Sequence, residues 1–331
     1  MKIVKTAYFD RFKCIASACP DSCCKEWTVQ VDAESAAYYR SLPGALGDRL
    51  RQVLTVDDDG DTIMKNENCR CPMWRQDGLC HIQADLGHDA LCKTCRDFPR
   101  LTHDYGDFVE MGLELSCPEA ARIILLSPAA TPIVEYADGG EAPEYDTHAM
   151  NVLLETREKM LAILADDSRP LGESLALGLM YGHHAQALLD GLDVAPFDPE
   201  AALQTAHKFG KILSADLPAF YADLEILTGT WSRRLASPSP AEWSAPIRAL
   251  ARYGVERFWL QAVSDYDLIC RVKMIIAACL LVKTLGGNPI ETAQLYSKEI
   301  ENNTDNVDAI LDAAYSHLAF TDENLLGLLL K

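Results

Sequence analysis

Hydrophobic residues recur at helical spacing through most of the second half of the chain. Apolar positions three and four residues apart are typical of amphipathic helices, and they occur in residues 150–166, 175–192, 200–213, 217–227 and 306–330. Residues 246–285 are almost continuously apolar, but Arg, Lys and Asp interrupt them, whereas a membrane span needs about 20 apolar residues with few charges. The pattern therefore predicts buried bundle helices, with Cys270 and Cys279 in the core, and no membrane partner.

The first 117 residues show no such periodicity, because Gly, Pro, Asp and Cys interrupt every apolar run. The alternation of Trp27, Val29 and Val31 predicts a short strand. Asp32 followed by Ser35 predicts the start of a helix. Residues 118–127 predict a further helix that opens at a proline, so regular structure in this half is expected to be sparse.

These patterns predict a mostly α fold, in which an irregular cysteine-rich N-terminal region with a metal or cluster site packs on a C-terminal helical bundle. We expect a cysteine-rich region at 1–127, a linker or surface loop at 128–147, where prolines and a Gly-Gly pair occur, and a helical domain at 148–331. Strands do not alternate with helices, so a doubly wound nucleotide-binding sheet is not expected. A cleft between the two parts would receive a substrate.

Cysteine is concentrated in one region, since ten of the twelve residues precede position 118. A secretory signal needs an apolar run of roughly 7–15 residues, and Lys5, Asp10 and Arg11 interrupt the N-terminal one. We therefore expect a cytoplasmic protein. Thiols there are usually reduced, so clustered cysteines favour metal binding or catalysis over disulfides.

The cysteine spacing suits soft metals. Cys92 and Cys95 form a C-x2-C pair, which can place two sulfurs on one ion or cluster. Structural zinc takes four thiolates, or thiolates with histidine, and an iron–sulfur cluster takes four cysteines. Both metals stay open at this point. His81 and His88 are weaker candidates, and some of the thiols are expected to be ordinary buried side chains.

The formal net charge of −19 and the pI near 4.8 argue against a nucleic-acid partner, which normally meets a basic surface. Both the cysteine-rich part and the remainder are net acidic. An acidic surface attracts a lysine-bearing partner at long range, although acidity also simply keeps a protein in solution.

Three segments carry a resemblance to a known family. They are FKCIASACPDSCCKEWTVQVD at 12–32, CPMWRQDGLCHIQADLGHDALCKTCRDFPR at 71–100 and ELSCPEAAR at 114–122. In this order they resemble the flagellin lysine-N-methylase family and the wider group of zinc- or iron-chelating proteins named for their cysteine cluster. The helical half is similar to the family only in character.

The resemblance implies transfer of methyl groups from S-adenosylmethionine to lysine ε-amines of flagellin, with an iron–sulfur cluster of the 4Fe–4S type, or zinc as the alternative metal. Which four thiols bind the cluster stays open, and Cys69 and Cys92 lie at less regular positions. The chain has no C-x3-C-x2-C loop, since Cys19-x3-Cys23 is followed by Glu26 at the third position. The cysteines that match the family are Cys14, Cys19, Cys23, Cys24, Cys71, Cys80, Cys95 and Cys117.

Methyl transfer to lysine needs a group that removes the proton of the ammonium, whose ordinary pKa is about 10.4. A carboxylate or a tyrosine can do this, and Glu26, Tyr105 and Glu114 are the catalytic candidates, with Asp97 and Glu110 nearby. For cofactor binding, Trp27 could stack on a cation. Arg96 and Arg100 could offset the negative charge of a cluster. Each of these residues could equally be an ordinary surface or core side chain.

Other function classes fit the same cysteines. A zinc- or iron-binding module without catalysis, acting as adaptor or carrier, is one, because no glycine-rich S-adenosylmethionine loop is evident. A redox sensor whose thiols respond to oxidants is another. Flagellin is the partner expected for the enzyme.

Overall fold

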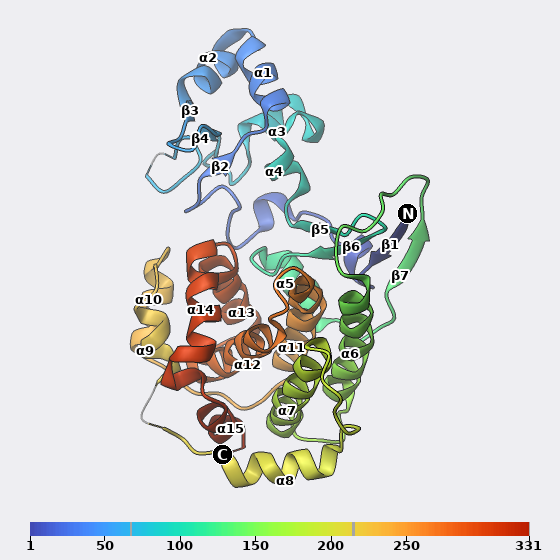
Figure 1. Ribbon diagram of the computed structural model, residues 1–331. Helices are drawn as coiled ribbons and strands as arrows, with labels where there is room; N and C mark the ends of the chain where they lie inside the picture. Colours follow the sequence, from blue (N-terminus) through green and yellow to red (C-terminus); the bar gives the residue numbers. More distant parts are fainter. Residues whose placement is uncertain (67, 214–215, 331) are drawn as a thin grey trace.

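The computed structural model describes residues 1–66, 68–213 and 216–330. It has two parts of unequal size (Figure 1). Residues 24–66 and 68–97 form the smaller part, here called the upper unit, and the other described residues form the main body. Each part has its own cluster of buried apolar side chains, so the two cores are separate.

The upper unit combines a small sheet with short helices around residues such as Leu50 and Tyr39, which are fully buried. Its antiparallel strands follow the order β2-β4-β3. The strands are β2 (Val29–Gln30), β3 (Leu54–Val56) and β4 (Thr62–Met64), and the helices are α1 (Ala33–Ser41), α2 (Gly44–Val53), α3 (His81–Leu86), the 3-10 turn η3 (His88–Ala90) and α4 (Lys93–Asp97).

The predictions for this unit from local pattern are confirmed. The short strand falls at residues 29–30, and α1 begins after Asp32, whose carboxylate accepts a hydrogen bond from the Ser35 amide at 2.9 Å. A side-chain oxygen at this position satisfies an amide that the helix leaves unpaired. The same carboxylate accepts the Lys93 amide at 2.8 Å, so one side chain holds the starts of α1 and α4 together.

A four-stranded sheet projects from one side of the main body (Figure 1). Its order is β5-β6-β1-β7, with β1 parallel to β6 and the other pairs antiparallel. The strands are β1 (Lys2–Lys5), β5 (Arg100–Asp104), β6 (Phe108–Leu113) and β7 (Ile133–Tyr136). Residues 128–147, predicted as a linker or surface loop, are largely exposed, but they contain the edge strand β7.

The main body is helical, as its periodicity predicts. Helix α12 lies at its centre and is buried on nearly every face, because its sequence is apolar all round. The helices are α5 (Pro118–Leu126), α6 (Thr147–Ala165), α7 (Leu171–Leu189), α8 (Pro199–Phe209), α9 (Leu217–Ala222), α10 (Gly229–Ala236), α11 (Ala245–Phe258), α12 (Leu268–Leu285), α13 (Pro289–Tyr296), α14 (Thr304–Ser316) and α15 (Asp322–Leu330). Short 3-10 turns are η1 (Phe9–Arg11), η2 (Ala16–Ala18), η4 (Trp259–Val263) and η6 (Leu318–Phe320), and η5 (Ser297–Glu301) is a π-helical turn.

The mostly α prediction is therefore confirmed. Cys270 and Cys279 are 1% and 0% exposed on α12, which confirms them as core residues. Among the described residues, no helix is both long and apolar enough to span a bilayer. Hydrophobic packing divides the chain differently from the predicted boundary at residue 127. Residues 8–12 and 108–125 belong to the core of the main body, because their apolar side chains face its helices.

Candidate functional site

Seven cysteines line one cavity of about 330 Å³, here called the thiol cavity. It lies where the upper unit meets the main body, and both parts supply cysteines. Aromatic and polar side chains complete the lining, among them Trp27, Phe98, Arg100 and Ser116. The cysteines of the thiol cavity are Cys14, Cys19, Cys23, Cys24, Cys80, Cys95 and Cys117.

Local structure presents these thiols from short turns and helix starts. Cys80 and Cys117 are the N-cap residues of α3 and α5, directly before the first helical residue of each. In α5 that first residue is Pro118. Cys95 lies within the single turn of α4. The amide ends of helices favour negative charge, which would favour a thiolate at Cys80, whereas burial disfavours it at Cys117.

Contacts between neighbouring sulfurs shift their acidities. A hydrogen bond with Cys24 lowers the pKa of Cys80 to about 6, and the same partner lowers the pKa of Cys71. A hydrogen bond with Cys95 lowers the pKa of Cys92. Burial instead raises the pKa of Cys117 to about 12. Thiolates are the metal-binding form of cysteine. The contacts between sulfurs lower the pKa of Cys80 but leave the pKa values of Cys24 and Cys95 raised.

Three other N-terminal cysteines, Cys69, Cys71 and Cys92, do not line the thiol cavity. Cys71 is buried in the upper core, with its sulfur 3.2 Å from that of Met64. Cys92 is also buried, and Cys69 is exposed. Within the described ranges, no three His, Cys, Asp or Glu side chains are gathered closely enough to hold one metal ion.

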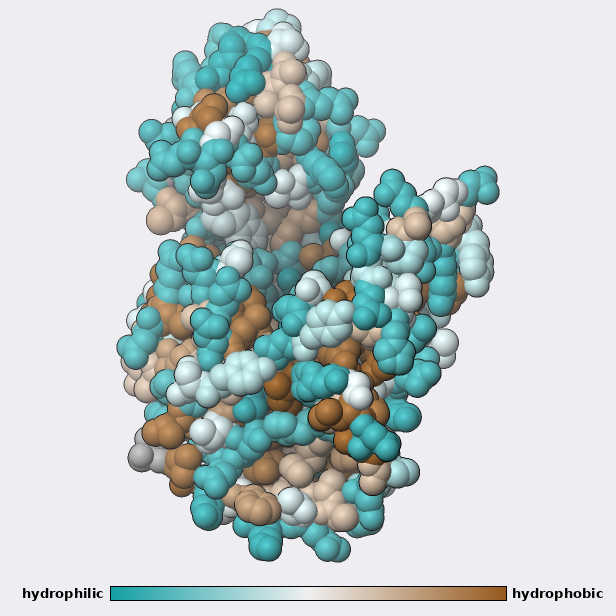
Figure 2. Space-filling view, viewed as in Figure 1, coloured by the Kyte–Doolittle hydropathy of each residue, from teal (hydrophilic) through white to brown (hydrophobic). Residues whose placement is uncertain are grey.

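A groove of about 840 Å³ lies on the other side of Phe98 and Arg100, which line both it and the thiol cavity. It runs between the upper unit and the sheet, where the space-filling view is indented (Figure 2). We call it the inter-unit groove. Its carboxylates are Asp32, Asp61, Asp97 and Glu114, and its cations are Lys93 and Arg100.

Glu114 connects the two spaces. Its side chain lines the inter-unit groove and accepts a hydrogen bond from the hydroxyl of Ser116, which lines the thiol cavity. Glu114 is only 9% exposed, and its amide donates to the Pro99 carbonyl at 2.7 Å. Backbone pairing thus fixes the carboxylate at the wall between groove and cavity.

Aromatic rings form the rest of that wall. The Trp27 and Phe98 rings lie 5.7 Å apart between centroids. The Arg100 guanidinium lies over Phe12, 5.2 Å from the ring centroid, and 5.9 Å from that of Phe9. Such cation–π contacts hold the guanidinium in place. Trp27 and Arg100 both line the thiol cavity, and their roles toward a cofactor stay predictions.

The other predicted residues lie elsewhere. Glu26 is not part of the thiol cavity, because its carboxylate is ion-paired with Lys298 at 2.6 Å. Arg96 is exposed, with its Nε 3.7 Å from Asp97, and it lines neither space. Nothing tests the roles of these residues, so they stay predictions.

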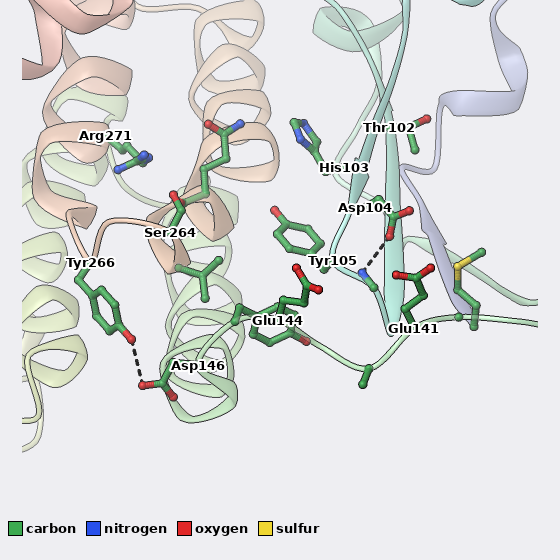
Figure 3. A pocket seen from close by; sticks show the side chains of 17 residues that line it. Thr102, His103, Asp104, Tyr105, Glu141, Glu144, Asp146, Ser264, Tyr266 and Arg271 are labelled. Carbon is green, nitrogen blue, oxygen red and sulfur yellow. Dashed lines mark hydrogen bonds between the residues drawn. The ribbon is translucent and has the colours of Figure 1, made fainter.

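Tyr105 lies in a separate hollow of about 1100 Å³ beside the sheet, together with Asp104, Glu141, Glu144 and Asp146 (Figure 3). Its ring stacks on Phe108 with 4.7 Å between centroids, and burial raises its pKa. The structure therefore brings Glu114, Trp27 and Arg100 to the thiols but places Tyr105 apart from them.

Sequence reasoning missed Lys298 and Asp21. Lys298 belongs to a helical stretch with no motif, and only the fold brings it to the cysteines. Asp21 lies between Cys19 and Cys23, and this position in a cysteine-rich loop was the one signal that could have drawn attention to it.

Comparison with known proteins finds curated relatives. The chain is 32% identical over 145 residues to the Lysine-N-methylase of Salmonella typhimurium, a match that covers 40% of this chain and 35% of that protein. It is 30% identical over 160 residues to the Flagellar biosynthetic protein FliU of Salmonella muenchen, covering 45% of this chain and 88% of that protein. The match thus spans about a third of the first relative's length. No family model and no solved structure matches the chain.

Proposed function

Because the chain belongs to the flagellin lysine-N-methylase family, we propose that it methylates lysine ε-amines of flagellin with S-adenosylmethionine as the methyl donor. The thiol cavity would hold an iron–sulfur cluster of the 4Fe–4S type. The observation that carries the proposal is the shared wall of Phe98 and Arg100, which puts a cavity lined by seven thiols next to an acidic groove.

The donor set of the cavity fits an iron–sulfur cluster. Cysteine thiolates are the usual ligands of such clusters, and seven cysteines line this one cavity. Four of these seven cysteines would hold it, with thiols available from both the upper unit and the main body. When bound, the cluster would supply one-electron chemistry, and S-adenosylmethionine would supply the methyl group.

The inter-unit groove suits a lysine-bearing protein segment. Its four carboxylates outnumber its two cations, so it attracts a lysine ammonium. Bonds to backbone amides from Lys93 and Ser35 lower the pKa of Asp32 to about 2, which keeps this carboxylate charged at neutral pH. The groove would hold the peptide and orient the side chain, and such positioning supplies much of the barrier reduction in group transfer.

Glu114 would take the proton. The acceptor nitrogen forms the new N–C bond and loses one proton, while the electron pair of the broken C–S bond stays on the sulfur of the donor. A buried carboxylate at the wall can receive this proton, and general bases contribute about 100-fold or more to rate. The hydroxyl of Ser116 orients the carboxylate for that role.

The test is an assay of anaerobically purified protein with S-adenosylmethionine and flagellin, read by intact mass and by iron and sulfide content. We expect mass increments of one methylene each, and about a 100-fold slower reaction for Glu114→Gln. Glu135→Gln on the exposed strand β7 is the matched control and should keep full activity. If the protein holds only zinc and binds no S-adenosylmethionine, the proposed function is wrong, and a non-catalytic metal-binding module is the function that remains.

A further inference from the structure

Lys298 is a buried lysine on the π-helical turn η5 of the main body, and its side chain is 2% exposed. Burying an ammonium is costly unless opposite charges and hydrogen bonds surround it. Its partners come from the other end of the chain: Nζ lies 2.8 Å from Asp21 Oδ2 and 2.6 Å from Glu26 Oε2. The same nitrogen lies 5.3 Å from the ring centroid of Trp27.

These three partners belong to residues 21–27, here called the cysteine loop, which also carries Cys23 and Cys24. Asp21 and Trp27 line the thiol cavity. Asp21 is also ion-paired with Lys25 at 3.2 Å within the loop, and Lys298 pairs with both carboxylates of the loop. One side chain of the C-terminal half therefore neutralises the loop and covers its indole ring.

Two backbone hydrogen bonds also join the cysteine loop to the upper unit. The Cys24 carbonyl accepts the Cys71 amide at 2.8 Å, and the Glu26 amide donates to the Cys69 carbonyl at 2.9 Å. Glu26 has a φ of +74°, which residues with a side chain seldom adopt. Such a conformation persists only where the surroundings fix it, and here the upper unit and Lys298 hold this residue from two sides.

The contact between Lys298 and the cysteine loop also affects how the two parts are placed relative to each other. Cys14, Cys19 and Cys117 belong to the main body, whereas Cys24, Cys80 and Cys95 belong to the upper unit, whose core is separate. A shift of one part against the other would change the distances between thiols across the cavity. Lys298 joins the main body to the loop that connects the two parts, and π-helical turns are frequent at functional sites.

We propose that Lys298 is a positioning residue, which locks the cysteine loop so that Cys23 and Cys24 face the thiol cavity at a fixed distance from Cys14, Cys19 and Cys117. Its role in holding a cluster rests on the proposed function, but the geometry of the loop does not. Glu26, predicted as a proton acceptor, is one of the two carboxylates that pair with Lys298.

The experiment compares Lys298→Met with Lys273→Met. Lys273 is a matched control, because it is also buried in the main body and ion-paired, with Nζ 3.0 Å from Asp322, on helix α12. In reduced, metal-free protein, alkylation of each cysteine by iodoacetamide is followed over time by peptide mass spectrometry. We expect Cys23 and Cys24 to react several-fold faster in Lys298→Met, with wild-type rates in Lys273→Met.

A second readout is the visible spectrum after anaerobic reconstitution with ferrous iron and sulfide. Lys298→Met should give a changed spectrum and lower iron content, and Lys298→Arg, which restores the positive charge, should recover part of both. Equal alkylation in Lys298→Met, Lys273→Met and wild type would overturn the proposal. If wild type takes up no iron, the proposed function fails, and alkylation alone decides on Lys298. Should Lys298→Met not fold, the double variant Asp21→Asn, Glu26→Gln removes the same ion pairs and carries the same expectation.

Discussion

The upper unit and the main body are built on different principles. The main body buries a large apolar core around α12, and its long helices satisfy their own backbone groups. The upper unit has short strands, helices of one to three turns and a small core that includes cysteines. Since small domains bury a lower fraction of their surface, the upper unit has less apolar stabilisation of its own.

This difference explains where the thiol cavity lies. A small unit is commonly stabilised by additional contacts beyond its own core, and the upper unit meets a larger neighbour at the thiol cavity. The cysteine loop, the wall of Phe98 and Arg100, and Lys298 all lie where the two parts meet. Both parts therefore supply thiols to the cavity, and the main body contributes the larger apolar core beside it.

The largest effect is expected in the main body. Trp259 is fully buried, and its indole donates to the Thr156 hydroxyl at 3.3 Å. Trp259→Ala should lower the free energy of unfolding by about 3–5 kcal/mol, because it leaves a large cavity and removes this hydrogen bond. Urea denaturation measures this loss. Tyr136→Ala, at an 80% exposed residue of β7, is the control and should change stability by less than about 0.5 kcal/mol.

Hydrogen exchange distinguishes the two parts in the same variant. Amides of the upper unit should also exchange faster in Trp259→Ala, because contacts with the main body stabilise that unit. Unchanged protection of the upper unit would show that it is stable by itself, and the comparison between the two parts would then be wrong.

Sequence patterns predicted the helical part well for a physical reason. Its helices repeat apolar residues at a period that only a helix can bury on one side, and α12 is apolar all round. The cap at Asp32 and the proline at Pro118 were also readable, since each acts within a few residues. Local chemistry of this kind needs no knowledge of the fold.

The sheet and the site were less predictable. Strand β1 pairs with β6 and β7, which lie more than one hundred residues away along the chain, and such pairing leaves no local signal. Seven of the eight predicted cysteines line one cavity, while the metal they were predicted to bind stays a prediction, and Glu26 and Tyr105 were chosen by nearness in sequence. The contact of Lys298 with Asp21 spans 277 positions, so only the folded chain reveals it.

A smaller effect is expected from the core of the upper unit. Leu50 is fully buried there, and Leu50→Ala should cost about 2–5 kcal/mol. Because the cores are separate, faster hydrogen exchange should be confined to residues 24–66 and 68–97, while α12 keeps its protection. Leu86→Ala, at a 37% exposed position of α3, is the matched control. Equal loss of protection in α12 would indicate one cooperative molecule instead of two parts.

The smallest change in the free energy of unfolding is expected for variants of Asp32, and its pH dependence distinguishes the role of the charge from that of the side chain's shape. Hydrogen bonds from the Lys93 and Ser35 amides lower its pKa to about 2, so the carboxylate stabilises the folded state at pH values above its ordinary pKa. This contribution is lost as the pH falls through about 2.

At neutral pH, Asp32→Ala should cost about 1 kcal/mol, the usual value of a helix cap. The difference from wild type, measured by urea denaturation at a series of pH values, should shrink toward zero between pH 4 and 2. Asp32→Asn, which keeps an oxygen acceptor but does not titrate, should lose less at neutral pH, and its difference from wild type should change over the same pH range. A gap between Asp32→Ala and wild type that is constant with pH would mean that the side chain acts by shape alone, and that charge does not tie α1 to α4.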